Sequence, residues 1–335
     1  MSINILMNCK NLSVTGSKGD TMEKYSSFAQ TTIGDRHIRN GVVCQDYSMS
    51  INNSTYVFAA VADGHGSPHY LRTDRGSRFA AECALDCVCE LLDTIKGNEF
   101  VLDDEKMRDD LLQQLWKNIV SRWKNRVEAD YRQEPFTQEE LDKVPDELSV
   151  YRSLYESGEF LSAYGTTLAF ITATENFAFC GQIGDGKCVA VDCSGITVDP
   201  VPDDPRCYDN ITTSICQEDA EFSARFVFFP KDCIPSAMFI GTDGLQNSYW
   251  DIEQLHSFYR GLTLDFAENG LNEGIRQLAE FLPVMTSNGS GDDISCAGIV
   301  DIESLQASVE TLRNAVSYIE APAPVPNDIP EDMTI

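Results

Sequence analysis

The sequence predicts an α+β fold in which antiparallel sheets pack together and helices lie outside them. Residues 73–95 and 104–130 carry apolar side chains at helical spacing. From about residue 165 the chain changes to short apolar segments typical of strands. Glu175 and Asn176 form a tight turn between the first two of these segments, which indicates a hairpin and therefore antiparallel pairing. Two late helices are expected, at residues 272–282 and 302–319.

The earlier part of the chain fits the same plan. Residues 24–66 are expected to form two short strands and a connecting loop that lead to a buried strand ending at Ala62. In the first helix Phe79, Cys83 and Cys87 share one stripe, which should face a sheet. Residues 133–157 are charged and lack an apolar period, so they are interpreted as loop and short helix.

One catalytic domain is expected over residues 21–320. Residues 1–20 form a polar lead-in, and residues 321–335 are rich in proline and acids, which predicts a disordered tail. No run of about 18 apolar residues and no signal-peptide pattern appears, so we expect a soluble, cytoplasmic protein.

The formal net charge is −28, from 25 basic and 53 acidic residues. Such a field repels phosphate backbones and anionic lipids, so nucleic acid and membranes are not expected as partners. The 12 cysteines lie mainly in apolar segments and form no CxxC pair, which indicates reduced, buried thiols.

Several apolar strands end or begin on an aspartate beside glycine. Any one of these corners can be an ordinary turn, because Asp-Gly is a common turn dipeptide. Strands of one sheet place their ends along a common rim, however, so several corners can converge on one spot. The corners are "VADGHG" (Asp63), "IGDG" (Asp185), "FIGTDG" (Asp243), "SGDDIS" (Asp292 and Asp293) and, less clearly, "CQDYS" (Asp46).

Converging carboxylates repel each other, and a hard divalent cation relieves that repulsion. Oxygen ligands without cysteine or paired histidine favour Mg²⁺ or Mn²⁺ over zinc, and the backbone carbonyl of Gly64 could be a further ligand. Two such ions would hold a bridging water and direct it at phosphorus. His65, next to Asp63, is then placed to protonate a leaving alkoxide.

These motifs resemble the metal-dependent protein serine/threonine phosphatases of the phosphatase 2C type, and the opening "GDRHIRNGVVCQDYS" is more similar to the bacterial branch of that family. The resemblance rests on "VADGHGS", "GTTLAF", "GQIGDGKCVAV", "GTDGLQNS" and "GDDIS" in that order, within residues 27–301. It implies a four-layer α-β-β-α sandwich of two antiparallel sheets flanked by helices, with the metal site at one edge.

The resemblance also implies roles for single residues. Asp63 would bridge both ions, Gly64 would offer its carbonyl, and His65 would be the general acid. Asp243 and Asp292 would complete the ligands of one ion, with Asp46 nearby through water, and Asp185 would join Asp243 around the weaker third ion of some members.

Three positions depart from the family pattern. Gly41 stands where many members have the arginine that binds substrate phosphate, and Gln45 replaces an acid. Asn247 replaces the aspartate of some members, which makes a third ion less secure than the first two. The candidates for the phosphate-binding arginine are Arg39, Arg72 and Arg75.

The predicted activity is hydrolysis of phosphoserine or phosphothreonine in proteins, by a hydroxide that bridges two Mg²⁺ or Mn²⁺ ions. The expected partner is a phosphorylated protein, together with a cognate serine/threonine kinase. One alternative is a pseudophosphatase that acts as a binding or regulatory module, and another is a hydrolase of small phosphate esters.

Several polar residues have simpler interpretations. Thr166 and Thr167 are expected to be packing residues of a strand rather than nucleophiles, because water is the attacking group. Arg75 can equally be an ion-pairing residue at the start of its helix. The other histidines are not expected to be catalytic: His37 is expected to hydrogen-bond in a loop, His69 to lie at the surface or support the site, and His256 to lie in a surface helix.

Overall fold

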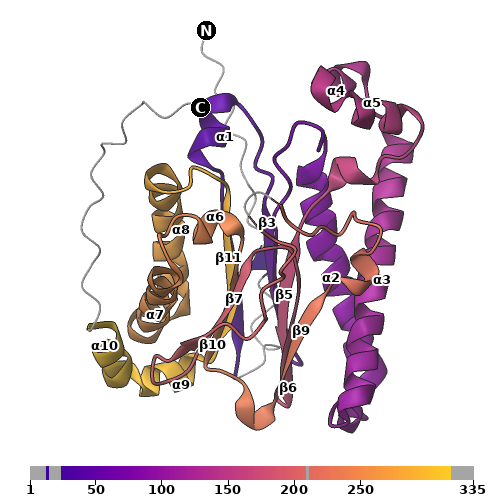
Figure 1. Cartoon of the computed structure of the whole chain (residues 1–335). Coiled ribbons are helices and arrows are strands. Elements are labelled where there is room, and N and C mark those ends of the chain that lie inside the picture. The colour runs from indigo at the N-terminus through magenta and orange to yellow at the C-terminus, as the bar shows by residue number, and fades with distance from the viewer. Residues whose placement is uncertain (1–12, 15–23, 209–210, 318–335) are drawn as a thin grey trace.

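Two β-sheets lie face to face at the centre of the computed structural model, with helices on both outer sides (Figure 1). The structure describes residues 13–14, 24–208 and 211–317. One sheet has the strand order β1-β3-β4-β5-β6-β9, and the other has the order β2-β11-β10-β7-β8. Apart from the parallel pair β1 and β3, the neighbouring strands are antiparallel. The strands are β1 Ser13–Val14, β2 Ser26–Thr32, β3 Tyr47–Asn52, β4 Val57–Ala62, β5 Leu168–Ala173, β6 Phe177–Ile183, β7 Lys187–Val191, β8 Thr197–Val198, β9 Arg225–Pro230, β10 Ala237–Gly241 and β11 Ile294–Val300.

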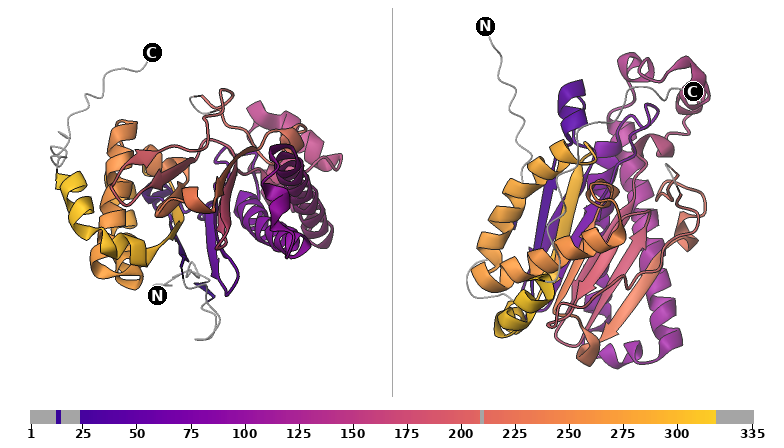
Figure 2. Two further views of the ribbon diagram at one scale, coloured as in Figure 1. Left: turned by 90° about the horizontal axis from the view of Figure 1, so that it is seen from below. Right: turned by 60° about the vertical axis from the view of Figure 1, so that its left-hand side comes forward.

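The helices form the two outer layers, so the predicted α-β-β-α arrangement is confirmed (Figure 2). Helices α2 and α3 cover the first sheet, and α7 and α8 cover the second. The helices are α1 Asp35–Asn40, α2 Thr73–Ile95, α3 Glu105–Gln133, α4 Gln138–Leu141, α5 Ser149–Glu156, α6 Asp243–Gln246, α7 Ile252–Asn269, α8 Leu271–Asn288, α9 Ile302–Ala307 and α10 Val309–Ser317, with short 3-10 turns at Glu99–Leu102, Asp146–Leu148, Leu161–Tyr164, Ala220–Phe222 and Lys231–Cys233.

The core follows from the alternation of side chains along the central strands. In β4, Val57, Ala59 and Val61 point to the space between the sheets, where they meet apolar residues of β10 and β11. The intervening Phe58 and Ala60 point the other way and pack against α2 and α3. Because β4 is covered on both faces, it is a continuous apolar run rather than an alternating one.

Most predicted elements are present. The β5–β6 hairpin turns at Glu175 and Asn176, with Ala173 opposite Ala178. The charged stretch after α3 contains the short helices α4 and α5, as expected. The link between β2 and β3, expected as a loop, instead contains α1, which ends at Gly41 with φ of 66°. That left-handed conformation favours glycine and ends the helix.

Parts of the predicted domain plan lie outside the described residues, namely most of the lead-in at residues 1–20 and the whole tail at residues 321–335. Within the described part of the chain, no helix is long and apolar enough to cross a membrane. No disulfide joins the cysteines described by the structure. Cys83, Cys87, Cys180, Cys188 and Cys296 are buried as expected, whereas Cys193 and Cys233 are exposed.

Candidate active site

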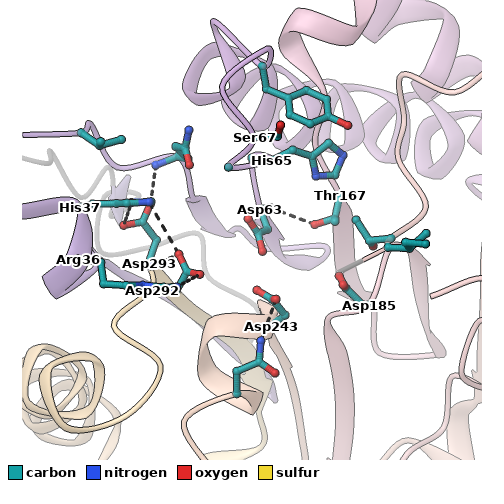
Figure 3. A pocket seen from close by; sticks show the side chains of 18 of the residues that line it. Arg36, His37, Asp63, His65, Ser67, Thr167, Asp185, Asp243, Asp292 and Asp293 are labelled. Carbon is teal, nitrogen blue, oxygen red and sulfur yellow. Dashed lines mark hydrogen bonds and ion pairs between the residues drawn. The ribbon is translucent and has the colours of Figure 1, made fainter. Parts of the chain in front are cut away.

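Four aspartates from separate strand ends face one pocket of about 770 Å³ (Figure 3). Asp63 directly follows β4, and Asp243 opens α6 after β10. Asp185 lies in the turn between β6 and β7, and Asp292 lies just before β11. Because neighbouring antiparallel strands alternate in direction, the end of one and the start of the next meet at the same edge, and the structure brings the four corners together there.

Two threonines hold the backbone of Asp63. The Thr166 hydroxyl and the Thr167 amide both donate to the Asp63 carbonyl at 2.8 Å, and the Asp63 amide donates to the Thr167 hydroxyl at 3.1 Å. These residues were expected only to pack. Gly64 is held as closely, since a Cβ atom there would lie 2.2 Å from the Thr73 hydroxyl.

Asp293 fixes the approach of the β2–β3 connection to the pocket. Its carboxylate accepts from the amides of Gly34 and Gln45, each at 2.6 Å, and from Nδ1 of His37 at 2.9 Å. These hydrogen bonds outweigh the effect of burial and lower the pKa of Asp293. The bond to Asp293 in turn raises the pKa of His37, which hydrogen-bonds as expected but lies in α1 rather than in a loop.

Asp46 is buried and is not among the described residues that line the pocket. Its carboxylate accepts from the Thr242 hydroxyl at 2.8 Å. Burial raises the pKa of Asp46 well above the ordinary range, and the charge of Asp293 adds to that effect. A place behind the pocket suits contact with a metal through water, which is the part that the resemblance implies for Asp46.

Asp63 lies at the centre of the electrostatic conflict. Burial raises its pKa well above the ordinary range, and the charges of Asp46, Asp243 and Asp185 add to the rise. Asp185 and Asp292 show the same pattern, because burial and the charge of Asp243 raise the pKa of both. Burial and the nearby charge of Asp243 thus raise the proton affinity of Asp63, Asp185 and Asp292, and a cation among these carboxylates would relieve that repulsion.

The donor set fits Mg²⁺ or Mn²⁺. The candidate ligands that face the pocket are carboxylate oxygens and the Gly64 backbone, and no cysteine is among the described residues that line it. These ions prefer oxygen ligands and keep several waters. Among the described residues, no three His, Cys, Asp or Glu side chains are close enough together to form a metal cage by themselves. The carboxylates of Asp63, Asp185, Asp243 and Asp292 instead face a shared space, in which bound water would complete the coordination of an ion.

Asn247 reduces the number of acids available to bind a third ion. It stands four residues after Asp243, and its side-chain amide donates to the Asp243 carboxylate at 3.0 Å. An aspartate there would add another charged oxygen, whereas the amide of Asn247 uses one Asp243 oxygen as its acceptor. Asp185 and Asp243 are left as the acids for such an ion.

His65 lines the pocket beside Asp63. Its amide donates to the Gly165 carbonyl at 3.2 Å, and its ring centroid lies 4.7 Å from that of Tyr70. Burial lowers the pKa of His65 to about 4, with a smaller effect from His69. At pH 7 the imidazole is therefore neutral, and a bound phosphate dianion would be needed to favour its protonated form.

The other two histidines have structural contacts. His69 is buried, bonds the Ser67 hydroxyl through Nδ1 at 2.9 Å, and stacks on Tyr151 with ring centroids 3.8 Å apart. His69 therefore supports the loop after His65 and is not a surface residue. His256 pairs with Asp199 at 2.7 Å in α7 and does not line the pocket.

The arginines predicted to bind phosphate need correction. Arg72 is buried and pairs with Glu140 at 2.8 Å, and Arg75 pairs with Asp130 and Glu134 at 3.1 and 2.8 Å. Neither lines the pocket, because both fasten α2 to the end of α3 and to α4. Arg39 pairs with Asp35 within α1 and does not line it either.

Arg36 was not among the predicted residues, but it is the one arginine or lysine among the described residues that line the pocket. Its guanidinium donates to the Asp292 carboxylate at 2.7 Å. The signal that could have found it is the short helix α1, which presents position 36 rather than 39 to the pocket. That helix is too short to show an apolar period.

The comparisons with known proteins agree with this geometry. The sequence profile described as Protein phosphatase 2C matches residues 33–283. The chain belongs to the protein phosphatase 2C family. No curated protein matches the chain by sequence.

Solved structures share the protein phosphatase 2C fold with this chain. PppA of Pseudomonas aeruginosa, a regulatory component of T6SS, is 16% identical with a TM-score of 0.50, and the match covers 84% of this chain and 99% of PppA. The serine/threonine phosphatase Stp1 of Staphylococcus aureus is 14% identical with a TM-score of 0.50, covering 86% and 99%. At such identities the likeness shows the fold, and the pocket's own residues must carry the functional argument.

Proposed function

We propose that this protein hydrolyses phosphoserine or phosphothreonine in proteins with the help of two Mg²⁺ or Mn²⁺ ions. The observation that carries the proposal is the meeting of Asp63, Asp185, Asp243 and Asp292 with His65 in one pocket, in a member of the protein phosphatase 2C family. The name of one similar structure, the serine/threonine phosphatase Stp1, agrees with this activity.

The carboxylates supply the metal ligands in this proposal. Asp63, the Gly64 carbonyl, Asp243 and Asp292 would hold the ions, and Asp46 would act on them through water. When bound, the ions would activate water for attack on phosphorus and neutralise the charge that develops there. Asp185 and Asp243 would hold a third ion only weakly, because Asn247 already bonds Asp243.

His65 supplies the proton for the leaving group. Its ring packs beside Tyr70 and lines the pocket next to Asp63. The phosphate dianion of a bound substrate raises the proton affinity of the imidazole, and the proton then passes to the serine or threonine oxygen as the P–O bond breaks.

Arg36 would bind the substrate phosphate, in place of the arginine that many family members have at the position of Gly41. Its side chain is 60% exposed and already reaches the pocket at Asp292, so a modest rotamer change brings it to a phosphate oxygen. The guanidinium would then exchange one oxyanion for another. Arg39, Arg72 and Arg75 have acidic partners elsewhere, which is why we propose Arg36 in their place.

The decisive experiment compares the purified protein with its Asp63→Asn variant on a phosphothreonine peptide in the presence of Mn²⁺. We expect turnover that chelator abolishes and that the variant lacks, with folding of both proteins checked by circular dichroism. Turnover that survives chelation would overturn the metal-dependent mechanism.

The same assay separates the two alternatives. A pseudophosphatase would turn over neither the peptide nor p-nitrophenyl phosphate, with or without Mn²⁺. A small-ester hydrolase would turn over p-nitrophenyl phosphate and no phosphopeptide. The presence of all four acids and of His65 favours the enzyme over the pseudophosphatase, because a non-catalytic relative has no need to keep them. The cognate kinase stays a prediction.

A further inference from the structure

Two exposed aliphatic side chains stand among the acids of the pocket. Val42 and Ile211 both line it, with exposed fractions of 39% and 50%. Each has exposed apolar neighbours on its own segment: Ile38 and Val43 near Val42, and Tyr208 opposite Ile211. We call these five residues the apolar mouth. Single exposed apolar residues are ordinary, but two aliphatic side chains that line a largely polar pocket, each with exposed apolar neighbours in the chain, indicate an interaction surface.

The apolar mouth has two halves, one on each side of the carboxylates. The Val42 amide donates to the His37 carbonyl at 2.9 Å, which places Val42 beside His37. Ile211 precedes Thr212, which lines the pocket together with Asp185. Figure 3 shows His37 and Asp185 on opposite sides of the pocket with Asp63 between them. A chain segment that delivers a phosphate to Asp63 would therefore pass Val42 on one side and Ile211 on the other.

The half that carries Val42 is firmly anchored. The Arg36 amide donates to the Gly291 carbonyl at 2.9 Å, and the Gly34 amide donates to the Asp293 carboxylate at 2.6 Å. Helix α1 is therefore fixed to the loop before β11, and Val42 follows it directly.

The half that carries Ile211 is anchored to the strands beneath. The Ile215 amide donates to the Thr166 carbonyl, and the Gly184 amide donates to the Thr213 hydroxyl, each at 3.0 Å. Tyr208 and Ile211 bond each other's backbone at 2.9 and 3.0 Å. A backbone held in place before binding loses less conformational freedom when a partner covers it, so both halves are suited to recognition.

We propose that the apolar mouth selects phosphoprotein segments with large apolar side chains on both sides of the phosphorylated residue. This inference rests on the proposed function. The phosphate enters the acidic pocket and would leave Val42 and Ile211 uncovered, whereas an extended segment advances about 3.3 Å per residue and carries its own side chains across the mouth. Apolar flanking side chains remove the exposed aliphatic surface from water, and acidic ones would face the pocket's carboxylates.

The test measures binding, which does not depend on turnover. Two fluorescent peptides of equal charge carry a non-hydrolysable phosphonate in place of the phosphothreonine phosphate, one with leucine and one with serine at the flanking positions. With Mn²⁺ present, fluorescence anisotropy should show about tenfold tighter binding of the leucine peptide by the unmodified protein. In the Val42→Ser/Ile211→Ser double variant the two dissociation constants should differ by less than about twofold.

Phe222 offers a matched control. It is 72% exposed on the same stretch of chain as Ile211 but does not line the pocket. Phe222→Ser should keep the tenfold preference, and thermal unfolding of all variants checks that they fold. Equal binding of the two peptides by the unmodified protein would overturn the inference, whether or not the protein is a phosphatase. A clear preference without any turnover would overturn the proposed function alone.

A second copy of this chain is the other occupant that could cover the mouth. Sedimentation of the unmodified protein and the double variant decides this. We expect both to have the same mass in solution. A dimer that the double substitution dissociates would show that the mouth is a subunit interface and would overturn the inference.

Discussion

The guanidinium of Arg36 lies 2.7 Å from the carboxylate of Asp292, although the two residues are 256 positions apart in the chain. Asp292 is a proposed metal ligand, and Arg36 is the proposed phosphate ligand. The Asp292 carboxylate would therefore interact with two cations, the Arg36 guanidinium and the metal ion. Binding of either cation must weaken the interaction of Asp292 with the other. Substrate phosphate would draw Arg36 away and leave Asp292 to the metal.

Arg36→Gln is expected to bind Mn²⁺ more tightly, by about tenfold, because it removes the cation that competes for Asp292. Isothermal titration calorimetry measures this directly. Phosphate should raise the Mn²⁺ affinity of the unmodified protein and have a smaller effect on the variant. Arg39→Gln, which removes the same charge from the exposed face of α1, is the control, and an equal gain there would mean that the effect is general electrostatics.

Asp63→Asn is expected to stabilise the metal-free protein and to abolish its stabilisation by Mn²⁺. At a Mn²⁺ concentration of about 100 times the dissociation constant, the unmodified protein should gain about 2.7 kcal/mol. Asparagine keeps the shape of Asp63 but removes the buried charge, which should raise the melting temperature in chelator by roughly 2–6 °C. Differential scanning calorimetry with chelator and with Mn²⁺ measures both effects.

The raised pKa of Asp63 fixes how the melting-temperature difference between Asp63→Asn and the unmodified protein, both in chelator, changes with pH. Because the pKa of Asp63 is raised in the folded protein, the native state binds more protons than the unfolded state, and stability falls as pH rises above the ordinary aspartate value of about 3.9. The melting temperature of Asp63→Asn relative to the unmodified protein should therefore grow from pH 4 to pH 7. A difference that shrinks over this range would contradict the raised pKa.

The acids of the site could be predicted from sequence because each follows local rules. Asp63 and Asp243 come directly after strands whose apolar runs are visible in the sequence, and both are followed by glycine. Antiparallel pairing then restricts these strand ends to one edge of the sheets. The hairpin at Glu175 and Asn176 was predictable for the same reason, since the turn and both strands are contiguous.

The arginines could not be predicted, because their partners are distant in sequence. Arg72 lies only three residues before Arg75 and seven after His65, so proximity to the motif made it a candidate. Arg72 instead pairs with Glu140, which lies 68 positions away in a segment with no apolar period. Helix α1 was missed likewise, because Gly291 and Asp293 hold its start from the far end of the chain.

Glu140→Gln is expected to cost about 1–3 kcal/mol of unfolding free energy at pH 7, since it leaves the buried Arg72 with only its longer ion pair to Asp130, at 3.6 Å. Burial opposes ionisation of Glu140, but its bonds to Arg72 and Thr137 prevail and lower its pKa to about 2. A carboxylate with a lowered pKa stabilises the fold at neutral pH, and this contribution is lost as pH falls from about 4.3 towards 2.

Urea unfolding at pH 7 and pH 3 measures the Glu140 contribution. The difference between Glu140→Gln and the unmodified protein should be smaller at pH 3. Glu128→Gln, which breaks an exposed pair with Arg132 on α3, should cost no more than about 0.5 kcal/mol. A pH-independent cost at Glu140 would indicate a packing effect and not an ion pair.

His65→Gln is expected to slow hydrolysis according to the leaving group. A threonine alkoxide needs a proton as the P–O bond breaks, so kcat on the phosphothreonine peptide should fall about 10²- to 10⁴-fold. p-Nitrophenolate is stable without a proton, so kcat on p-nitrophenyl phosphate should fall far less. Steady-state kinetics with both substrates gives the two ratios, and His256→Gln, at a histidine outside the pocket, should change neither. Equal losses on both substrates would show that His65 positions the substrate or the metal ligands, and that the proton for the leaving oxygen comes from elsewhere.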